Sequence, residues 1–260
     1  MRMSCCAHCT AADTNFGLEA ARSDVERYRR RGPDRPTRLM LESIRKIPSE
    51  AIEGGCLLDI GAGIGVIHHE LLGDPIVSAT HVEAASAYTH VAKEEDARRG
   101  VEGTVDYVLG DAVELSEDLP AADLVTLDRA ICCYPDWRSL VRVSASKARR
   151  WYAFSVPHER WYVRSAVAIQ NLLRRLRGNE FRTFVHPVLE IDCMLVERGF
   201  RRIALRRTLV WHVALYASAS EDISERLLRD AAATPATAST RPARPSSRGA
   251  GAARRPPRPR

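Results

Sequence analysis

The sequence contains no run of about 18 apolar residues, so no segment is predicted to cross a membrane. Its first residues, MRMSCCAHC, lack the apolar stretch of a secretory signal, and we therefore expect a cytoplasmic protein. Evenly spaced pairs of cysteines are missing as well, and the total of seven is odd. Reduced thiols are expected instead of a disulfide framework.

Acidic residues are absent from residues 235–260, which carry seven arginines. Without this segment the formal net charge of +6 becomes −1, so the basic character of the chain belongs to its tail. Net charge thus gives no support to a nucleic-acid-binding face on the folded part. A second basic stretch at residues 27–38 could still form a local patch.

One cysteine-rich cluster lies near the start of the chain, where Cys5, Cys6, His8 and Cys9 offer four soft ligands within five residues. Such a cluster could hold zinc or iron. Ligands this close in sequence rarely complete a tetrahedron alone, and the sequence shows no second pair to complement them. We therefore favour a mobile, solvated N-terminus over a metal site.

Three zones follow one another along the chain. Residues 1–50 are predicted to form a helical lead-in, with one helix over about 16–30 and a second capped by Thr37. Residues 51–218 alternate apolar runs with amphipathic stretches and are predicted to form one domain. Residues 219–260 read as a short helix followed by a Pro/Ala/Arg-rich segment that buries too little apolar surface to fold.

Strand and helix patterns alternate through the central zone. The predicted strands are 56–60, 76–82, 105–109, 124–127, 151–156, 202–207 and 210–216, and the predicted helices are 66–72, 84–99, 136–149, 161–176 and 187–198. Strands separated by helices form parallel sheets through right-handed crossovers. The last two strands are separated only by Thr208 and Leu209 and should pair antiparallel. We predict an α/β fold: a Rossmann-like, seven-stranded, mainly parallel sheet with an antiparallel last strand, in three α/β/α layers.

A glycine-rich loop follows the first predicted strand, with Gly61, Gly63 and Gly65 in the pattern D-x-G-x-G-x-G. Glycines let the backbone turn tightly and approach a ligand, and the helix that follows presents unpaired N–H groups. The dinucleotide fingerprint requires Gly or Ala where this chain has Val66. Asp59 would repel a pyrophosphate, yet it suits a ligand that carries an ammonium group.

Further acids follow the next three strands. Glu83 ends the second strand and could accept hydrogen bonds from both hydroxyls of a ribose. Asp111 follows the third strand, where it could receive an adenine amino group, and Asp128 follows the fourth. Together with Asp59, these residues place four acids at the ligand-binding edge of the predicted sheet.

This ordered set resembles the class I S-adenosylmethionine-dependent methyltransferases over roughly residues 50–217, through the segments DIGAGIG at 59–65, Glu83, Gly110-Asp111 and DLVTLD at 123–128. The resemblance implies a methyltransferase with S-adenosylmethionine as its cofactor. By the same resemblance, the loop from Gly61 through Ala62 to Gly65, with Asp59 and Asp128, would contact the methionine part. Glu83 would bind the ribose, and Asp111 with Ala112 the adenine.

A finer resemblance rests on LDRAICCYPD at residues 127–136 and on residues 181–186. Both segments look like the arrangement in magnesium-protoporphyrin O-methyltransferases and their relatives, which does not establish a porphyrin substrate. Methyl transfer by direct in-line displacement requires neither a metal nor a covalent step, because the sulfonium of this cofactor already activates the methyl group. The protein mainly aligns the acceptor, and such positioning can contribute about 7–11 kcal/mol.

Three residues are predicted to act at the methyl-transfer end: Asp128, Tyr134 and His186. A hydroxyl acceptor would benefit from a base, for which Tyr134, His158 and His186 are candidates, whereas a carboxylate acceptor is already ionised. Each has a structural alternative: His186 could cap the next helix, Tyr134 could pack on the sheet, and Asp128 could accept backbone N–H groups.

Two pairs of residues, each adjacent in the sequence, are expected to have no chemical role. His68 and His69 on the first helix are expected to be solvated or to make capping contacts. Cys132 and Cys133 lie where some RNA cytosine-5 methyltransferases place a nucleophile, but they precede Pro135 instead of following a proline directly. Buried, inert thiols are the preferred interpretation.

Substrate selection is expected to come from an insertion at about residues 157–187. Its helix has an apolar stripe at Tyr162, Ala166, Ile169, Leu173 and Leu176, with arginines on the other face. We expect this stripe to pack in the core, with an acceptor lid or a surface that contacts a membrane or an anionic substrate as alternatives. The predicted activity is O-methylation of a small molecule, and the alternatives are a nucleic-acid methyltransferase that uses the basic tail and a noncatalytic protein of the same fold.

Overall fold

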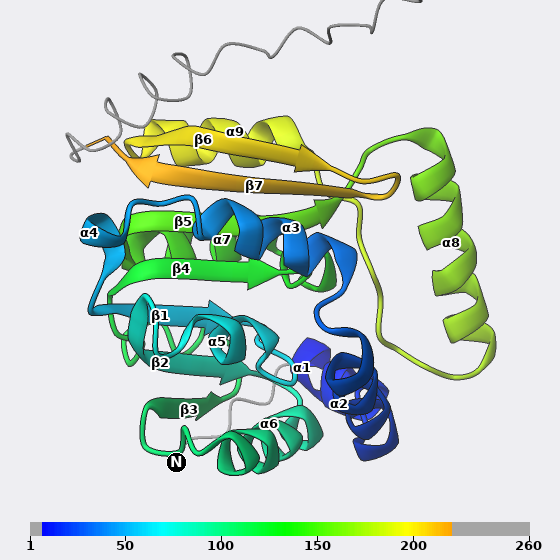
Figure 1. Ribbon diagram of the computed structural model, residues 1–260. Helices are drawn as coiled ribbons and strands as arrows, with labels where there is room; N and C mark the ends of the chain where they lie inside the picture. The colour runs from blue at the N-terminus through cyan, green and yellow to red at the C-terminus, as the bar shows by residue number, and fades with distance from the viewer. Residues whose placement is uncertain (1–6, 220–260) are drawn as a thin grey trace, which may run out of the picture.

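The computed structural model describes residues 7–219, with side chains from residue 10 onward, and contains one seven-stranded sheet (Figure 1). The strands are β1 Gly55–Ile60, β2 Ile76–Glu83, β3 Val105–Leu109, β4 Ala122–Asp128, β5 Ala148–Pro157, β6 Phe200–Arg207 and β7 Trp211–Ser218. Their order is β3-β2-β1-β4-β5-β7-β6, and β7 runs antiparallel to both of its neighbours while the other pairs are parallel. The predicted sheet, including its antiparallel last strand, is confirmed.

Helices cover both faces of the sheet. They are α1 Ala7–Asn15, α2 Leu18–Arg31, α3 Arg35–Ile44, α4 Ser49–Ile52, α5 Val66–Leu71, α6 Ser86–Arg99, α7 Trp137–Lys147, α8 Trp161–Leu176 and α9 Val188–Glu197, with the 3₁₀ turn η1 at Ile131–Cys133. One apolar cluster joins α7 and α9 to the sheet, and a second joins α3, α4 and α5 to its other face. The three-layer α/β/α prediction is therefore confirmed.

The interior strand β5 shows how the sequence produces this layering. Trp151, Tyr152, Ala153 and Phe154 are consecutive and fully buried, as expected for a strand covered on both sides. Because side chains alternate along a strand, Trp151 and Ala153 join the cluster that contains α3, while Tyr152 and Phe154 join the cluster that contains α7 and α9.

The N-terminal region differs from its prediction. The helix expected over 16–30 is preceded by α1, and α3 begins at Arg35, before the position expected for its cap. Asp34 occupies the N-cap position and Pro36 lies in the first turn, where a proline is tolerated because the missing N–H has no helical partner there. Thr37 lies inside α3 and is buried. Its prediction as a cap is wrong.

The face of helix α8 that was predicted to pack in the core is exposed. Ile169 and Leu176, from the stripe expected in the core, are 59% and 74% exposed, while Val163 on the other side of the helix is buried. Asn171 holds the helix to the returning chain through hydrogen bonds with the backbone of Thr183. Figure 1 shows α8 standing beside the sheet, outside the layers formed by the other helices.

Two predictions concern residues outside the described range. The tail expected from 219 lies beyond residue 219, and Cys5 and Cys6 precede residue 7; His8 and Cys9 fall in α1, but their side chains are also outside the described part. Within residues 7–219, none of the helices has both the length and the apolar character needed to span a bilayer.

Candidate functional site

The glycine loop between β1 and α5 takes a left-handed backbone at Gly61, Gly63 and Gly65, where φ is +68°, +59° and +85°. A Cβ on Gly61 would lie 2.5 Å from the Cβ of Ala130, and one on Gly65 would lie 2.4 Å from the ring of His68. At Gly63 the nearest side-chain atom would be 3.8 Å away. The middle of the loop therefore has room beside it, whereas both ends are packed against protein.

Asp59 lies near the end of β1, 1% exposed, at the base of this loop. Its Oδ1 accepts a hydrogen bond of 2.6 Å from the Thr126 hydroxyl, and its Oδ2 has no hydrogen-bond partner among the described residues. Burial raises the pKa of Asp59 to about 7, and the nearby acids Asp128 and Glu83 act in the same direction. A buried carboxylate oxygen that lacks a donor is suited to receive a cationic ligand.

Glu83 ends β2 and holds the loop from the other side. Its carboxylate accepts hydrogen bonds from the backbone N–H groups of Gly63 at 2.8 Å, Ala84 at 2.8 Å and Ala85 at 2.9 Å. Burial raises the pKa of Glu83, and these three N–H groups oppose that shift. A carboxylate accepts about four hydrogen bonds, so one further bond can be added without breaking those present.

Asp111 and Tyr134 meet beyond the end of β3. The Tyr134 hydroxyl donates to both carboxylate oxygens of Asp111, at 3.0 and 2.9 Å, and the backbone N–H of Val113 donates to Oδ1 at 2.8 Å. Asp111 and the adjacent Ala112 are 3% and 6% exposed. The structure thus joins a residue predicted to contact adenine with one predicted to act in catalysis.

Asp128 ends β4 and is held by two hydroxyls. The Ser155 and Thr37 hydroxyls donate to its two oxygens, each at 2.5 Å, so α3 and β5 both fix this carboxylate. The next residue, Arg129, has a left-handed φ of +59°, which is uncommon outside glycine. Its guanidinium lies 3.1 Å from Asp34 and 3.5 Å from Asp128.

A cavity of about 90 Å³ lies beside Asp59, Asp128 and the glycine loop, and its lining does not include Glu83, Asp111 or Tyr134. Its floor contains five of the predicted site residues, Asp59, Gly61, Ala62, Gly63 and Asp128. Its roof comes from α2 and the turn before α3, through Asp24, Arg27, Tyr28, Gly32, Pro33 and Asp34. The volume is below the roughly 300–1,000 Å³ usual for small-molecule sites, so as it stands the cavity matches one end of a larger ligand.

No protein-family model matches the sequence, and no curated protein matches it significantly. Solved structures do match its fold. Magnesium protoporphyrin IX methyltransferase from Synechocystis PCC 6803, in a crystal structure with bound SAH (S-adenosylhomocysteine), aligns with a TM-score of 0.60 over 80% of this chain and 99% of its own, at 15% identity. An O-methyltransferase family protein from Burkholderia thailandensis aligns with a TM-score of 0.56 over 79% of this chain and 64% of its own, at 13% identity.

The chain has the class I methyltransferase fold. The resemblance inferred from the glycine loop and the four acids is thus confirmed at the level of the fold. In this class I methyltransferase fold, β1, β2 and β4 bring Asp59, Glu83 and Asp128 to one edge of the sheet, because the carboxyl ends of parallel strands point the same way.

His186 lies outside the cavity lining. It is 6% exposed, its Nε2 donates to the backbone oxygen of Tyr134 at 2.9 Å, and its ring stacks on Phe184. Burial lowers the pKa of His186. His158, the other histidine considered as a base, contacts the backbone oxygen of Thr208 at 3.1 Å. Both imidazoles thus contact backbone carbonyls in this fold.

The histidines of α5 differ from their prediction. His68 and His69 are 0% and 8% exposed, and both bind Asp96 of α6 instead of contacting water. The expectation that they are solvated is wrong, because α5 packs on β1 and β2 and both rings face the buried Asp96 of the neighbouring helix α6. Cys132 is buried and Cys133 partly so, and each thiol lies near the backbone oxygen of Arg129.

Sequence reasoning missed the roof of the site. The sequence predicted Thr37 only as a helix cap, and it did not single out Asp34 or Arg129 as site residues. Thr37 contacts Asp128 across 91 positions of the chain, and no local pattern reveals such a pair. Arg129 follows Asp128 directly, so its place beside the site was the one available signal.

Proposed function

We propose that this protein binds S-adenosylmethionine and transfers its methyl group to a small-molecule acceptor. The observation that carries the proposal is the shared cavity of Asp59, Asp128 and the glycine loop, with Glu83 bonded to the loop at its middle glycine. A glycine loop alone fits many nucleotides. The buried acid below it favours a ligand whose end is cationic, as the methionine part of this cofactor is.

The residues present fit that cofactor part by part. The Oδ2 of Asp59, which lacks a donor among the described residues, and the carboxylate of Asp128 would face the ammonium end. Gly63 leaves space for the cofactor to approach the backbone closely. Glu83 can accept one further hydrogen bond, from a hydroxyl of the ribose. Asp111 with Ala112 would take the adenine, and the hydroxyl of Tyr134 would hold Asp111 in place.

S-adenosylmethionine supplies an already activated methyl group when bound. The chain would orient the acceptor, keep water out through the roof of α2, and stabilise charge with Asp128 and Arg129. Neither the Tyr134 hydroxyl nor the His186 ring belongs to the lining of the described cavity. This arrangement favours a carboxylate oxygen as acceptor, because an ionised acceptor requires no base to remove a proton.

Calorimetry with S-adenosylhomocysteine tests the cofactor assignment. We expect 1:1 binding with a dissociation constant in the range of about 1–50 μM, since this ligand retains the ammonium, ribose and adenine groups. Glu83→Ala should weaken binding at least tenfold. Glu94→Ala is the matched control, because Glu94 is exposed on α6 and pairs with His90. Absence of binding at 100 μM to the folded protein would reject the cofactor.

The second candidate is a protein of the same fold that either has no catalytic activity or catalyses another reaction. A [4+2]-cyclase, SpnF, also aligns with this chain, with a TM-score of 0.52 at 12% identity, so this fold can serve other reactions. Labelled S-adenosylmethionine, incubated with the protein and fractionated host-cell extract, separates the two. A labelled small molecule identified by mass spectrometry supports transfer. Binding without any labelled product would favour the second candidate.

A further inference from the structure

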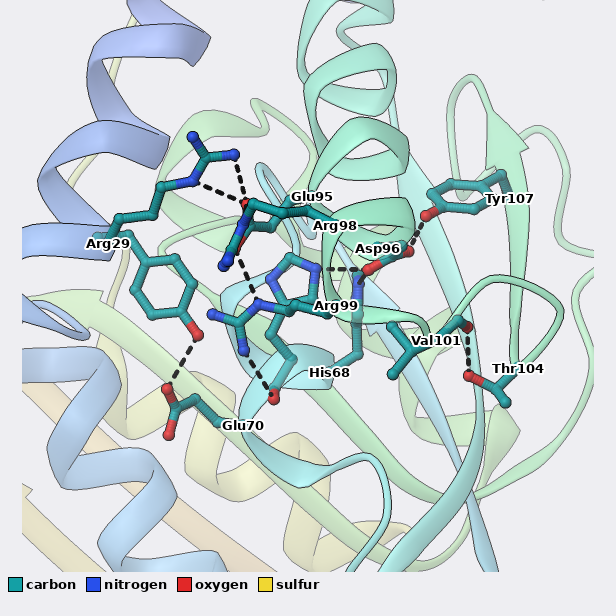
Figure 2. Close-up of polar contacts among 12 residues, drawn as sticks. Arg29, His68, Glu70, Glu95, Asp96, Arg98, Arg99, Val101, Thr104 and Tyr107 are labelled. Carbon is teal, nitrogen blue, oxygen red and sulfur yellow. Dashed lines mark hydrogen bonds and ion pairs between the residues drawn. The ribbon is translucent and has the colours of Figure 1, made fainter.

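A group of buried polar residues lies between α5, α6 and the neighbouring strands, outside the cavity described above (Figure 2). The Nε2 atoms of His68 and His69 lie 3.2 and 2.5 Å from the same oxygen, Oδ1 of Asp96. Tyr107 of β3 donates its hydroxyl to the other oxygen of Asp96. His81 of β2 lies next to this group, with its ring centre 5.4 Å from that of His68.

This group contains more imidazole nitrogen atoms than its hydrogen bonds use. The Nδ1 atoms of His68 and His69 and both ring nitrogens of His81 have no hydrogen-bond partner within residues 7–219. Each buried polar atom left in this state costs about 1–3 kcal/mol.

We propose that His68, His69 and Asp96 bind a divalent transition-metal ion of the zinc type. Their ligand atoms all lie within 4.8 Å of one another, close enough to surround one ion after small side-chain shifts. Two imidazoles and one carboxylate suit zinc or cobalt, whereas calcium and magnesium prefer sites made of oxygen alone. The Tyr107 hydroxyl would orient the carboxylate from its second oxygen.

Such an ion would support the glycine loop from below. His68 is also the residue whose ring lies where a Cβ of Gly65 would be, so fixing its ring fixes the end of the loop. The ion would tie α5 to α6 and would stand apart from any methyl-transfer step. Its binding therefore does not depend on the function proposed above.

Zinc titration of the full-length chain tests this site. The protein would carry Cys5→Ser, Cys6→Ser and Cys9→Ser, so that the N-terminal thiols cannot supply a competing site. After removal of metal with a chelator, Zn²⁺ is added in competition with a chromophoric chelator. We expect one equivalent to bind and the unfolding temperature to rise with Zn²⁺ concentration.

Two variants decide the outcome. His69→Gln should reduce bound Zn²⁺ below about 0.1 equivalent, while His90→Gln, which alters an exposed histidine of α6, should retain one equivalent. Co²⁺ gives a second readout, because its visible absorption reports imidazole and carboxylate ligands in the folded protein. The proposal is overturned if the serine-substituted protein binds less than 0.1 equivalent, or if His69→Gln binds as much as His90→Gln.

A separate observation concerns the outer face of α8. Trp161, Ile169, Leu172, Leu173 and Leu176 are between 45% and 79% exposed and fall within about 120° of the helical circumference. Leu209, in the turn between β6 and β7, is 76% exposed and is joined to the start of α8 by the Tyr162 hydroxyl. Exposed apolar residues gathered in this way mark an interaction surface.

The charges on α8 indicate its partner. The helix contains Arg164, Arg174 and Arg175 and no acidic residue, and Arg160 and Arg177 adjoin its two ends. An apolar face bordered by arginines, with a tryptophan at one end, is typical of helices that lie in the interface of an anionic membrane. We infer that α8 is a membrane-surface helix and that an anionic lipid bilayer is its partner.

Vesicle co-sedimentation of the full chain tests this surface. Binding to phosphatidylcholine vesicles containing 30% phosphatidylserine should be at least fivefold stronger than to pure phosphatidylcholine. The double change Ile169→Ser and Leu176→Ser should reduce it at least fivefold, with Val196→Ser, an exposed residue of α9, as control. All forms keep the basic tail, so the difference reports α8. Unchanged vesicle binding by the double variant would overturn the inference. A second copy of the chain would be the partner instead if light scattering showed the unsubstituted protein as a dimer and the double variant as a monomer.

Discussion

At the scale of single residues, the three glycines of the loop share a left-handed backbone and differ in what surrounds them. Gly65 faces the ring of His68, whereas Gly63 faces open space on the side of the cavity. The sequence pattern predicted a loop with all three glycines in equivalent roles. The structure separates a glycine required for packing from a glycine that leaves room for a ligand.

Alanine substitutions should therefore affect stability and ligand binding to different degrees at these two positions. Gly65→Ala should lower the free energy of unfolding by about 3 kcal/mol, because backbone strain and overpacking against His68 add together. Gly63→Ala should cost only about 1 kcal/mol, from backbone strain, yet weaken S-adenosylhomocysteine binding at least tenfold. Urea denaturation and calorimetry measure the two effects. Equal losses of stability would contradict the assigned roles.

The buried carboxyl of Asp59 predicts a pH dependence of binding. Its pKa is raised to about 7, so the group is mostly protonated at pH 6 and mostly ionised at pH 8. A ligand with an ammonium group binds the ionised form, so affinity for S-adenosylhomocysteine should rise roughly tenfold over this range. Stability should change the other way, because a raised carboxyl pKa means that the folded state loses stability as pH increases from about 4 to 7.

Asp59→Asn provides the control for this titration. The variant should bind weakly at every pH, with the slope between pH 6 and pH 8 abolished. A slope that persists in the variant would assign the titration to another group, of which Asp128, Glu83 and His68 are the nearest.

The predictable part of the site consists of residues set by strand ends. Asp59, Glu83 and Asp128 could be placed because the end of an apolar run marks the end of a strand, and parallel strands end at one edge. Thr37 and Arg129 could not be placed, because their positions depend on how α3 packs over the sheet. The partnership of Tyr134 with Asp111 was missed because the two residues are 23 positions apart and follow different strands.

At the scale of elements, α2 is tied to α6 by one buried acid. Glu95 is 0% exposed, and it accepts hydrogen bonds from Arg29 of α2 and from Arg98 and Arg99 of its own helix. Although burial opposes ionisation, these three guanidinium groups hold the pKa of Glu95 well below its usual value. Arg29 is thus a charged link between α2, which contributes to the roof of the cavity, and α6.

Removing this link should loosen the roof. We expect Arg29→Ala to speed amide hydrogen exchange across α2 at least fivefold, while global stability falls by only about 1 kcal/mol because Glu95 keeps two partners. Arg30→Ala is the matched control, since Arg30 contacts only the backbone of α2 within the described chain. Equal exchange in both variants would show that α2 is held by its other contacts, which include the hydrogen bond from Tyr88 to Asp24.

Element types were largely predictable, and their orientation was less so. The strand over Val105–Leu109 and the helix over Trp161–Leu176 have the predicted bounds. Helical periodicity identifies an apolar stripe, but it does not show whether that stripe packs against the rest of the protein or lies on its surface. Helix α8 shows this limit, because its most regular apolar face is exposed.

At the scale of the whole molecule, charge is divided between the fold and the tail. Deleting residues 235–260 changes the formal charge from +6 to −1. We expect the full chain to bind DNA weakly at about 50 mM salt and to lose this binding above about 200 mM, as electrostatic binding does. The truncated chain should not bind DNA, while its affinity for S-adenosylhomocysteine stays within twofold. Fluorescence anisotropy and calorimetry measure these outcomes.

DNA binding that survives the truncation would instead place a basic surface on the folded part, for which residues 27–38 are the candidate. The structure gives several of these arginines other partners: Arg27 pairs with Asp24, and Arg29 with Glu95. Internal pairing of this kind reduces the charge available to a phosphate backbone.

The roof of the cavity comes from residues that precede the sheet in the chain, and its floor comes from the sheet itself. A protein that began at Gly55 would keep every strand but have an open trough in place of a chamber. The same strands could therefore serve different ligands if the leading helices were exchanged, with no change to the framework beneath. In this molecule, access to the cavity and the architecture of the sheet are encoded in separate stretches of the chain.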